Sequence, residues 1–176
     1  MELTDERVFT HFLVGLVLLS RLADVGSTYL VSPTLALEAN PVANRGRWPF
    51  ALITLLACLL PYYSAPLGVV VFTVSFLVAG SNLSRAWVAR ALGESEYRAM
   101  FVRAATLGRP HSAVAFTLAS STCTAVVGLL LMSFSGETQW GYWFGVGILV
   151  YAGAIAFYGS AFVLRLFREV SRSNLR

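Results

Sequence analysis

Long apolar stretches separated by short polar segments dominate the pattern of this chain. A transmembrane helix needs about 20 mostly apolar residues, and five stretches approach that length. They are residues 8–32, 49–64, 67–92, 112–133 and 140–167. The pattern therefore predicts an all-α fold, in which residues 1–176 form a single membrane domain built as a polytopic bundle of five transmembrane helices.

The second stretch, 49–64, is the shortest, and it is joined to the third by a segment that contains Pro61 and Pro66. Each proline removes a backbone donor and favours a turn. Read as one helix, residues 49–85 would be longer than a bilayer requires. We therefore expect a helical hairpin, with a four-span arrangement as the alternative.

Arginine placement predicts the orientation. All 13 basic residues are arginine, and with five spans all of them except Arg7 and Arg21 fall on one side of the membrane. Cytoplasmic segments carry an excess of basic residues, which places the N-terminus outside and the C-terminus in the cytoplasm of a cell membrane. A four-span arrangement would also be asymmetric, but only the hairpin places all the aromatic residues of the turns at the outer interface. These are Tyr62, Tyr63, Trp140, Tyr142 and Trp143.

The long third loop has the pattern of an amphipathic helix over residues 94–107, between Gly93 and Gly108. Glu94 and Arg98 share its polar face. Its apolar face carries Tyr97, Met100, Phe101 and Ala104. Such a helix is typical of the cytoplasmic membrane interface.

Composition agrees with a lipid environment, because 57% of residues are apolar and only 12% are charged. The absence of lysine excludes retinal and pyridoxal-phosphate sites that need a lysine Schiff base. His11 and His111 fall on opposite sides of the predicted bundle, which argues against bis-histidine haem. Cys58 and Cys123 lie inside apolar stretches and are expected to be packing residues.

A polar cluster is predicted near the cytoplasmic leaflet. Arg21, Asp24 and Thr28 lie on one face of the first helix, where polar groups are costly unless they have partners or water. Asn82 and Arg85 of the third stretch reach the same side in the five-span topology. The intervening loop adds Glu38 and Asn40. We expect Ser32 and Pro33 to begin a short helix in this loop, which Asn40 and Pro41 would end.

The residue types of this cluster allow two kinds of ligand. The oxygen-bearing side chains of Asp24, Thr28, Glu38 and Asn40 would suit a divalent cation, with Asp24 and Glu38 as the candidate metal ligands. The guanidinium groups of Arg21 and Arg85 would suit a phosphate or carboxylate. A purely structural interpretation is also open, in which Arg21 and Asp24 simply neutralise each other.

The spacing Asp24-x-x-x-Thr28, followed by Glu38-Ala-Asn40-Pro41, resembles a small membrane domain of bacteria and archaea to which no function has been assigned. The resemblance extends over residues 19–85. It implies that Asp24, Thr28, Glu38 and Asn40 are the characteristic positions, and it brings no activity with it.

Small residues line the fourth and fifth stretches, including Gly141-x-x-x-Gly145 and the series Ala115, Ala119 and Cys123. Such spacing lets helix backbones approach closely, either inside one chain or between copies in a homo-oligomer.

These observations leave three functions open. The first is a binding or transport-related protein whose cluster holds an ion or an anionic lipid headgroup. The second is a lipid-modifying enzyme using Asp24 or Glu38 as a base, and the third is a non-catalytic subunit of a membrane complex. We expect the bilayer as the environment, no nucleic-acid partner, and no cofactor apart from a divalent cation under the metal interpretation.

Overall fold

The computed structural model describes residues 2–35, 37, 41–137 and 139–173, and the regular elements within these ranges are all helices. They are α1 (Glu2–Val31), α2 (Pro41–Ile53), the 3-10 helix η1 (Thr54–Leu59), α3 (Leu60–Tyr63), α4 (Ala65–Leu92), α5 (Glu94–Leu107), α6 (Pro110–Phe134), α7 (Trp140–Ala154), the π-helix η2 (Ile155–Gly159) and α8 (Ser160–Ser173). The predicted all-α class is confirmed.

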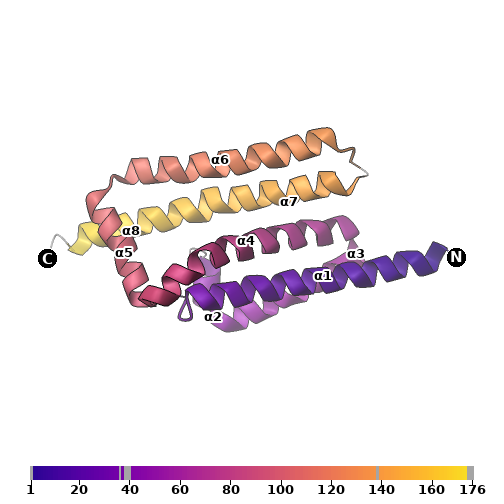
Figure 1. Cartoon of the computed structure of the whole chain (residues 1–176), viewed down its shortest axis with the longest axis horizontal. Helices are drawn as coiled ribbons and strands as arrows, with labels where there is room; N and C mark the ends of the chain where they lie inside the picture. The colour runs from indigo at the N-terminus through magenta and orange to yellow at the C-terminus, as the bar shows by residue number, and fades with distance from the viewer. Residues whose placement is uncertain (1, 36, 38–40, 138, 174–176) are drawn as a thin grey trace.

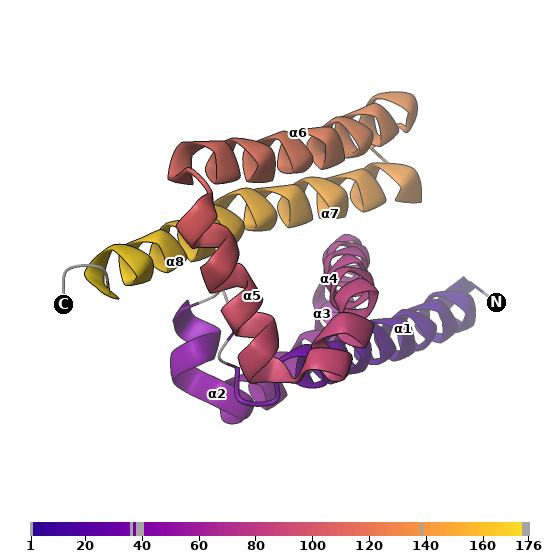
Figure 2. The ribbon, with the colours of Figure 1, turned by 60° about the vertical axis from the view of Figure 1, so that its left-hand side comes forward.

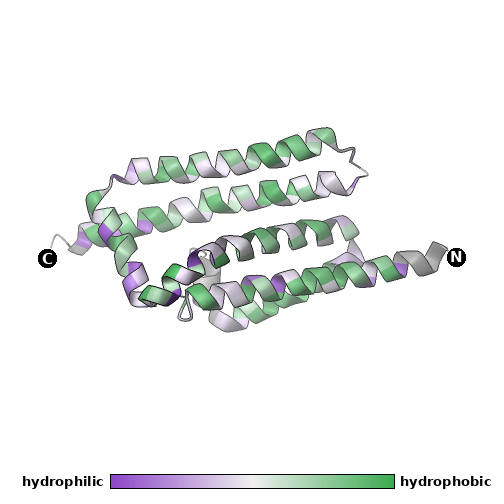
Figure 3. Cartoon of the chain, viewed as in Figure 1, coloured by the Kyte–Doolittle hydropathy of each residue, from purple (hydrophilic) through white to green (hydrophobic). Residues whose placement is uncertain are grey.

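Four helical stretches in the described ranges are long and apolar enough to cross a membrane. They are Arg7–Val31, Ala65–Leu92, Pro110–Phe134 and Trp140–Arg172. Figure 3 shows hydrophobic residues along these helices, with hydrophilic ones concentrated on α5 and α8. The composition and length of these helices indicate a membrane protein.

The helices form two packed pairs that run along the same axis (Figure 1). α1 packs along α4, α6 packs along α7, and contacts between α4 and α7 join the pairs. α5 crosses from one pair to the other at the end where the C-terminus lies (Figure 2). The N-terminus and the turn between α6 and α7 lie at the opposite end.

The segment predicted as the short second span is helical from Pro41 to Tyr63, in the three consecutive parts α2, η1 and α3. Its apolar part, Trp48–Tyr63, is shorter than the four long helices. At Ser64 the backbone becomes extended, with φ −156° and ψ 113°, and the chain turns into α4. The turn expected between Pro61 and Pro66 is therefore present.

The prediction of a short helix after Ser32 is wrong. Residues 32–35 form a turn in which Leu35 has a φ of 60° and is buried. The Ser32 hydroxyl does not cap a helix, because it donates to Glu94 of α5 and accepts the Leu37 N–H at 3.1 Å. Pro41 does not end a helix but begins α2, where its missing N–H costs nothing.

α5 has the predicted bounds, but its buried face is rotated from the predicted one. Tyr97 and Ala105 are buried, whereas Met100 and Ala104 are exposed. The reason is that α5 packs against α8, where Ala105 contacts a cluster with Leu166 and Val170. On the polar face, Arg98 and Glu94 contact different elements: Arg98 donates to both carboxylate oxygens of Glu169 on α8, at 2.8 Å.

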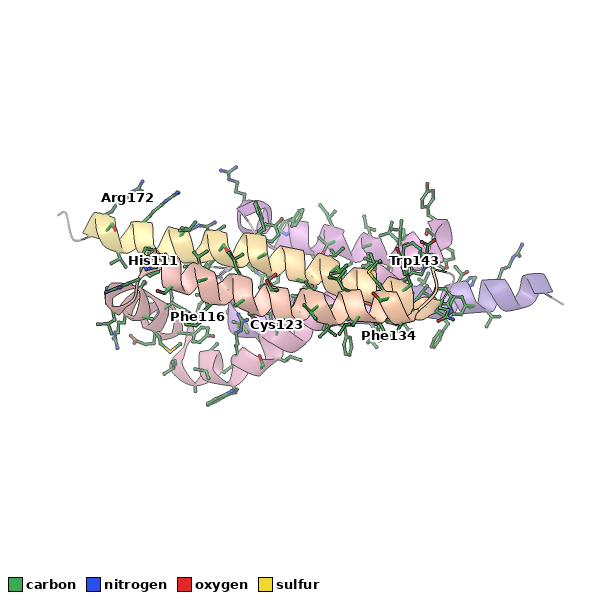
Figure 4. The ribbon with its side chains drawn as sticks, turned by 90° about the horizontal axis from the view of Figure 1, so that it is seen from above. His111, Phe116, Cys123, Phe134, Trp143 and Arg172 are labelled. Carbon is green, nitrogen blue, oxygen red and sulfur yellow. The ribbon has the colours of Figure 1, made fainter. Side chains whose placement is uncertain are left out.

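Small residues bring α7 close to two other helices. A Cβ added at Gly145 would lie 2.7 Å from the Gly128 carbonyl oxygen of α6, and one added at Gly147 would lie 2.7 Å from the Thr73 Cβ of α4. Gly145 therefore serves packing inside the chain. On α6, Cys123 and Phe116 point outward (Figure 4), and a homo-oligomer through this outer face stays a prediction.

Candidate functional site

A cavity of about 560 Å³ lies between the two helix pairs and α5. This volume is in the range of small-molecule sites in proteins, which is about 300–1,000 Å³. Its lining includes five of the seven residues predicted for the polar cluster: Arg21, Asp24, Thr28, Asn82 and Arg85. The other two, Glu38 and Asn40, lie outside the described residues.

An ion pair forms the floor of this cavity. Arg21 Nη1 lies 2.6 Å from Asp24 Oδ2, and the two side chains are only 16% and 15% exposed. Arg21 also donates to Ser75 of α4, at 3.2 Å, and to Thr54 of η1. Arg21 therefore joins three helical segments, although its buried Nε has no hydrogen-bond partner among the described residues.

Thr54 is a site residue that the sequence did not indicate. A threonine inside an apolar helix commonly bonds its own backbone, and Thr54 Oγ1 does donate to the Ala51 carbonyl at 2.6 Å. Its oxygen can still accept the Arg21 hydrogen bond. Only the fold, which places η1 against α1, identifies this second partner.

An amide bridge occupies the middle of the cavity wall. Asn82 Nδ2 donates to Thr28 Oγ1 at 3.0 Å and to Ser27 Oγ at 3.3 Å. The Ser27 hydroxyl in turn donates to the Asp24 backbone carbonyl at 2.9 Å. Asn82 thus links α4 to α1, and its amide nitrogen is engaged by Thr28 and Ser27.

Arg85 stands apart from these two groups, at the mouth of the cavity. It follows Ser75 on α4 by ten residues, which is about 15 Å along a helix axis. Its described polar contact is Nη2 to Ser81 Oγ at 3.0 Å, and the residue is exposed. The predicted single cluster is therefore divided by depth into an ion-paired floor, an amide bridge and a separate cation at the mouth.

Aromatic side chains form a further part of the cavity lining, the aromatic wall. They come from α2, α5, η2 and α8, and they are Trp48, Phe50, Tyr97, Phe101, Tyr158 and Phe162. Sequence reasoning did not assign them to the site, since an apolar helix face predicts packing against any neighbour. The π-helix η2 contributes Tyr158, and such segments are often found at functional sites.

The turn after α1 covers part of the cavity mouth, where Ser32, Leu35 and Leu37 join the lining. Glu94 at the start of α5 holds this turn, because its carboxylate accepts the Ser32 hydroxyl and the Thr34 N–H, the latter at 3.1 Å. These contacts connect the turn to the same helix that supplies Tyr97 and Phe101.

The predicted metal interpretation is not supported by the described residues, which contain no group of three or more histidine, cysteine, aspartate or glutamate side chains that could hold an ion. The carboxylate of Asp24 is engaged by Arg21. Because Glu38 and Asn40 lie outside the described residues, the divalent cation stays an untested prediction.

Comparison with models of known protein families gave no match, and neither the curated proteins nor the solved structures gave one. The resemblance noted in the sequence therefore rests on its four positions alone, of which Asp24 and Thr28 line the cavity.

Proposed function

We propose that this protein is a small membrane-embedded binding protein whose cavity holds an anionic group, a phosphate or carboxylate, carried by a free ion or by a lipid headgroup. The observation that carries the proposal is the charge of the cavity lining. Among the described residues two arginines and one carboxylate line it, and that carboxylate, Asp24, is already paired with Arg21. Arg85 is left as a cation without an ion-pair partner among the described residues.

Arg85 is suited to such a ligand by its geometry. Its guanidinium uses Nη2 for the bond to Ser81, and the rest of the planar fork can donate to two oxygens of one phosphate or carboxylate. At a membrane interface the partner of such an arginine is commonly a lipid phosphate or an anion from water. Arg85 at the mouth therefore favours a binding role. At the floor, Arg21 and Asp24 neutralise each other, and a structural role is enough to explain that pair.

No specific observation supports the hypothesis of a lipid-modifying enzyme. It needs Asp24 or Glu38 as a base, but Asp24 is in an ion pair and Glu38 lies outside the described residues. The subunit hypothesis rested on small residues that could contact another protein. Two of these residues, Gly145 and Gly128, instead pack α7 on α6 within one chain.

We further propose five membrane passes, with the N-terminus outside and the C-terminus in the cytoplasm of the cell membrane. The hydrogen bonds of Arg21 with Ser75 and of Thr28 with Asn82 join residues 54 apart. A constant offset means that α1 and α4 run parallel, so the chain between them has to return along the bundle. Helices α2, η1 and α3 provide this return in 23 residues, about 34 Å of helix.

The two ends of the bundle also support this orientation. His111 and Arg172 lie at one end, whereas Phe134 and Trp143 lie at the other (Figure 4). Cysteines introduced singly at Ser64 and at Gly136 should react with an impermeant maleimide in intact cells, while one at Ser95 should be protected. Protection at Ser64 or labelling at Ser95 would contradict the proposed topology.

Anion binding is tested on the purified full-length chain in detergent at constant ionic strength. Inorganic phosphate and phosphatidic acid are the two probes, and the stabilisation of the protein against heat is the readout. We expect at least one probe to raise the melting temperature of the wild type, and Arg85→Gln to abolish this rise. Arg90→Gln is the matched control, because Arg90 is an exposed arginine of α4 outside the cavity lining. Absence of binding by both probes, or equal binding by the Arg85 variant, would refute the proposal.

A further inference from the structure

We infer that the ligand of this cavity is an amphiphile, with a phosphate group at Arg85 and an apolar body that lies between α4 and the aromatic wall. This inference rests on the proposed function and specifies its ligand class. A small ion would fill only part of the cavity and would not account for its apolar lining.

The polar groups of the cavity lie at separate depths, and among the described lining residues the cation without an ion-pair partner is Arg85, at the mouth. At the floor, Arg21 is engaged by Asp24, Ser75 and Thr54. In the middle, the Asn82 amide is engaged by α1. An anion therefore finds its described charge partner at Arg85, and the lining extends from this residue toward the Arg21–Asp24 pair.

Between the polar groups of the amide bridge and of the floor, the lining of the cavity also contains apolar and aromatic side chains. Along α4, the lining continues from Arg85 through Asn82 to Val78 and Val74, and Val74 precedes Arg85 by eleven positions, about 16 Å along the helix axis. Phe101 of α5 and Tyr158 of η2 line the same cavity. A phosphate ion at the mouth would leave most of the 560 Å³ unfilled, whereas a hydrocarbon body would be buried against this wall.

The architecture also limits the length of the bound body. The Arg21–Asp24 pair closes the floor about 15 Å from Arg85 along α4, and a hydrocarbon end gains nothing by entering a polar floor. Affinity should therefore rise with chain length at first and then stop rising once the body reaches the floor.

The test is a chain-length series on the purified full-length protein, with inorganic phosphate, ethyl phosphate, hexyl phosphate and hexadecyl phosphate as probes. Each affinity is obtained from the dependence of the melting temperature on probe concentration. We expect hexyl phosphate to bind at least about tenfold more tightly than inorganic phosphate, since each buried methylene contributes favourably. We expect the gain per methylene to fall between hexyl and hexadecyl phosphate.

A cavity-filling variant gives a second readout. Val78→Phe should weaken hexyl phosphate binding by about tenfold or more, and should leave inorganic phosphate binding within about twofold, because the substitution occupies the apolar space and not Arg85. Leu83→Phe is the matched control, since Leu83 lies on α4 outside the lining and is 52% exposed. If Val78→Phe does not fold, Val74→Phe replaces it, and the chain-length series on the wild type needs no variant.

The outcomes separate the two proposals. Equal affinity for inorganic and hexyl phosphate, with Arg85 still required, would overturn the amphiphile and leave anion binding standing. If Val78→Phe weakened inorganic phosphate and hexyl phosphate equally, the amphiphile would also be overturned. The filled space would then not be the place where the hexyl chain binds. Absence of binding by every phosphate would refute the proposed function itself.

Discussion

Replacing Gly145 by alanine tests the contact that holds α6 against α7. The new Cβ would lie 2.6 Å from Met132 Cγ and 2.7 Å from the Gly128 carbonyl oxygen. The methionine side chain can change its rotamer, but the carbonyl belongs to a helix backbone and cannot turn away alone. The two helices must therefore separate by several tenths of an ångström before the contact becomes an ordinary one.

The expected cost follows from overpacking. Extra methyl or methylene groups forced into a packed interface cost about 1–3 kcal/mol, and a chain of this size loses about 2–4 °C of melting temperature per kcal/mol. Gly145→Ala should thus lower the melting temperature by about 2–12 °C. Gly145→Leu should lower it further or change the elution volume, since its branched side chain separates the backbones more.

Gly153 supplies the matched control on the same helix. A Cβ added there meets no atom within 4 Å, and alanine is favoured over glycine in a helix by about 0.5–1 kcal/mol. Gly153→Ala should therefore melt at the wild-type temperature or slightly above it. The measurement is thermal unfolding in one detergent, followed by intrinsic fluorescence, with size-exclusion chromatography of each variant. If Gly145→Ala melts like Gly153→Ala, the α6–α7 contact does not have the closeness described above.

Three further predictions concern the remaining polar contacts. Asp24→Asn should destabilise the protein by about 2 kcal/mol, which is less than the loss of one partner from a fully buried ion pair costs. Adding Arg21→Met should recover part of this loss in a thermal double-mutant cycle. Strictly additive losses would count against the ion pair. Glu94→Ala should accelerate hydrogen exchange at the Thr34 amide, and an unchanged rate would mean that another group protects it. The buried Ser121 hydroxyl of α6 donates to the Ala152 carbonyl of α7 at 2.7 Å. Ser121→Ala removes this one hydrogen bond and should therefore cost about 1 kcal/mol or less in the same melting measurement; a loss of several kcal/mol would point to a wider role.

The helices could be predicted from the sequence because apolar length is a local property. α5 shows where local information ends. Its bounds follow from Gly93 and Gly108, but its buried face depends on which partner it meets. Packing on Leu166 and Val170 of α8 selected Ala105 instead of the predicted Ala104, a rotation that no pattern within residues 94–107 specifies.

The polar half of the site could be predicted for a similar reason. Ionisable groups inside apolar helices are costly, so Arg21 and Asp24 stand out in the sequence. Their depth relative to Arg85 could not be read there, because it depends on how α1 is aligned with α4. The aromatic wall was equally hidden, since Trp48 and Phe101 belong to helices whose apolar faces are ordinary by themselves.

The division by depth separates stability from binding in a way that two substitutions can measure. At the floor, Asp24 compensates Arg21 inside the bundle, so Asp24→Asn leaves a guanidinium without its carboxylate and should lower the melting temperature. At the mouth, Arg85 is exposed and its described bond is to Ser81 on the same helix, so Arg85→Gln should leave the melting temperature nearly unchanged while it abolishes stabilisation by phosphate probes. The reverse pattern, in which Arg85→Gln unfolds the protein and Asp24→Asn removes binding at full stability, would place the ligand at the floor. The ion pair would then be the binding group, and the cation at the mouth would serve the fold.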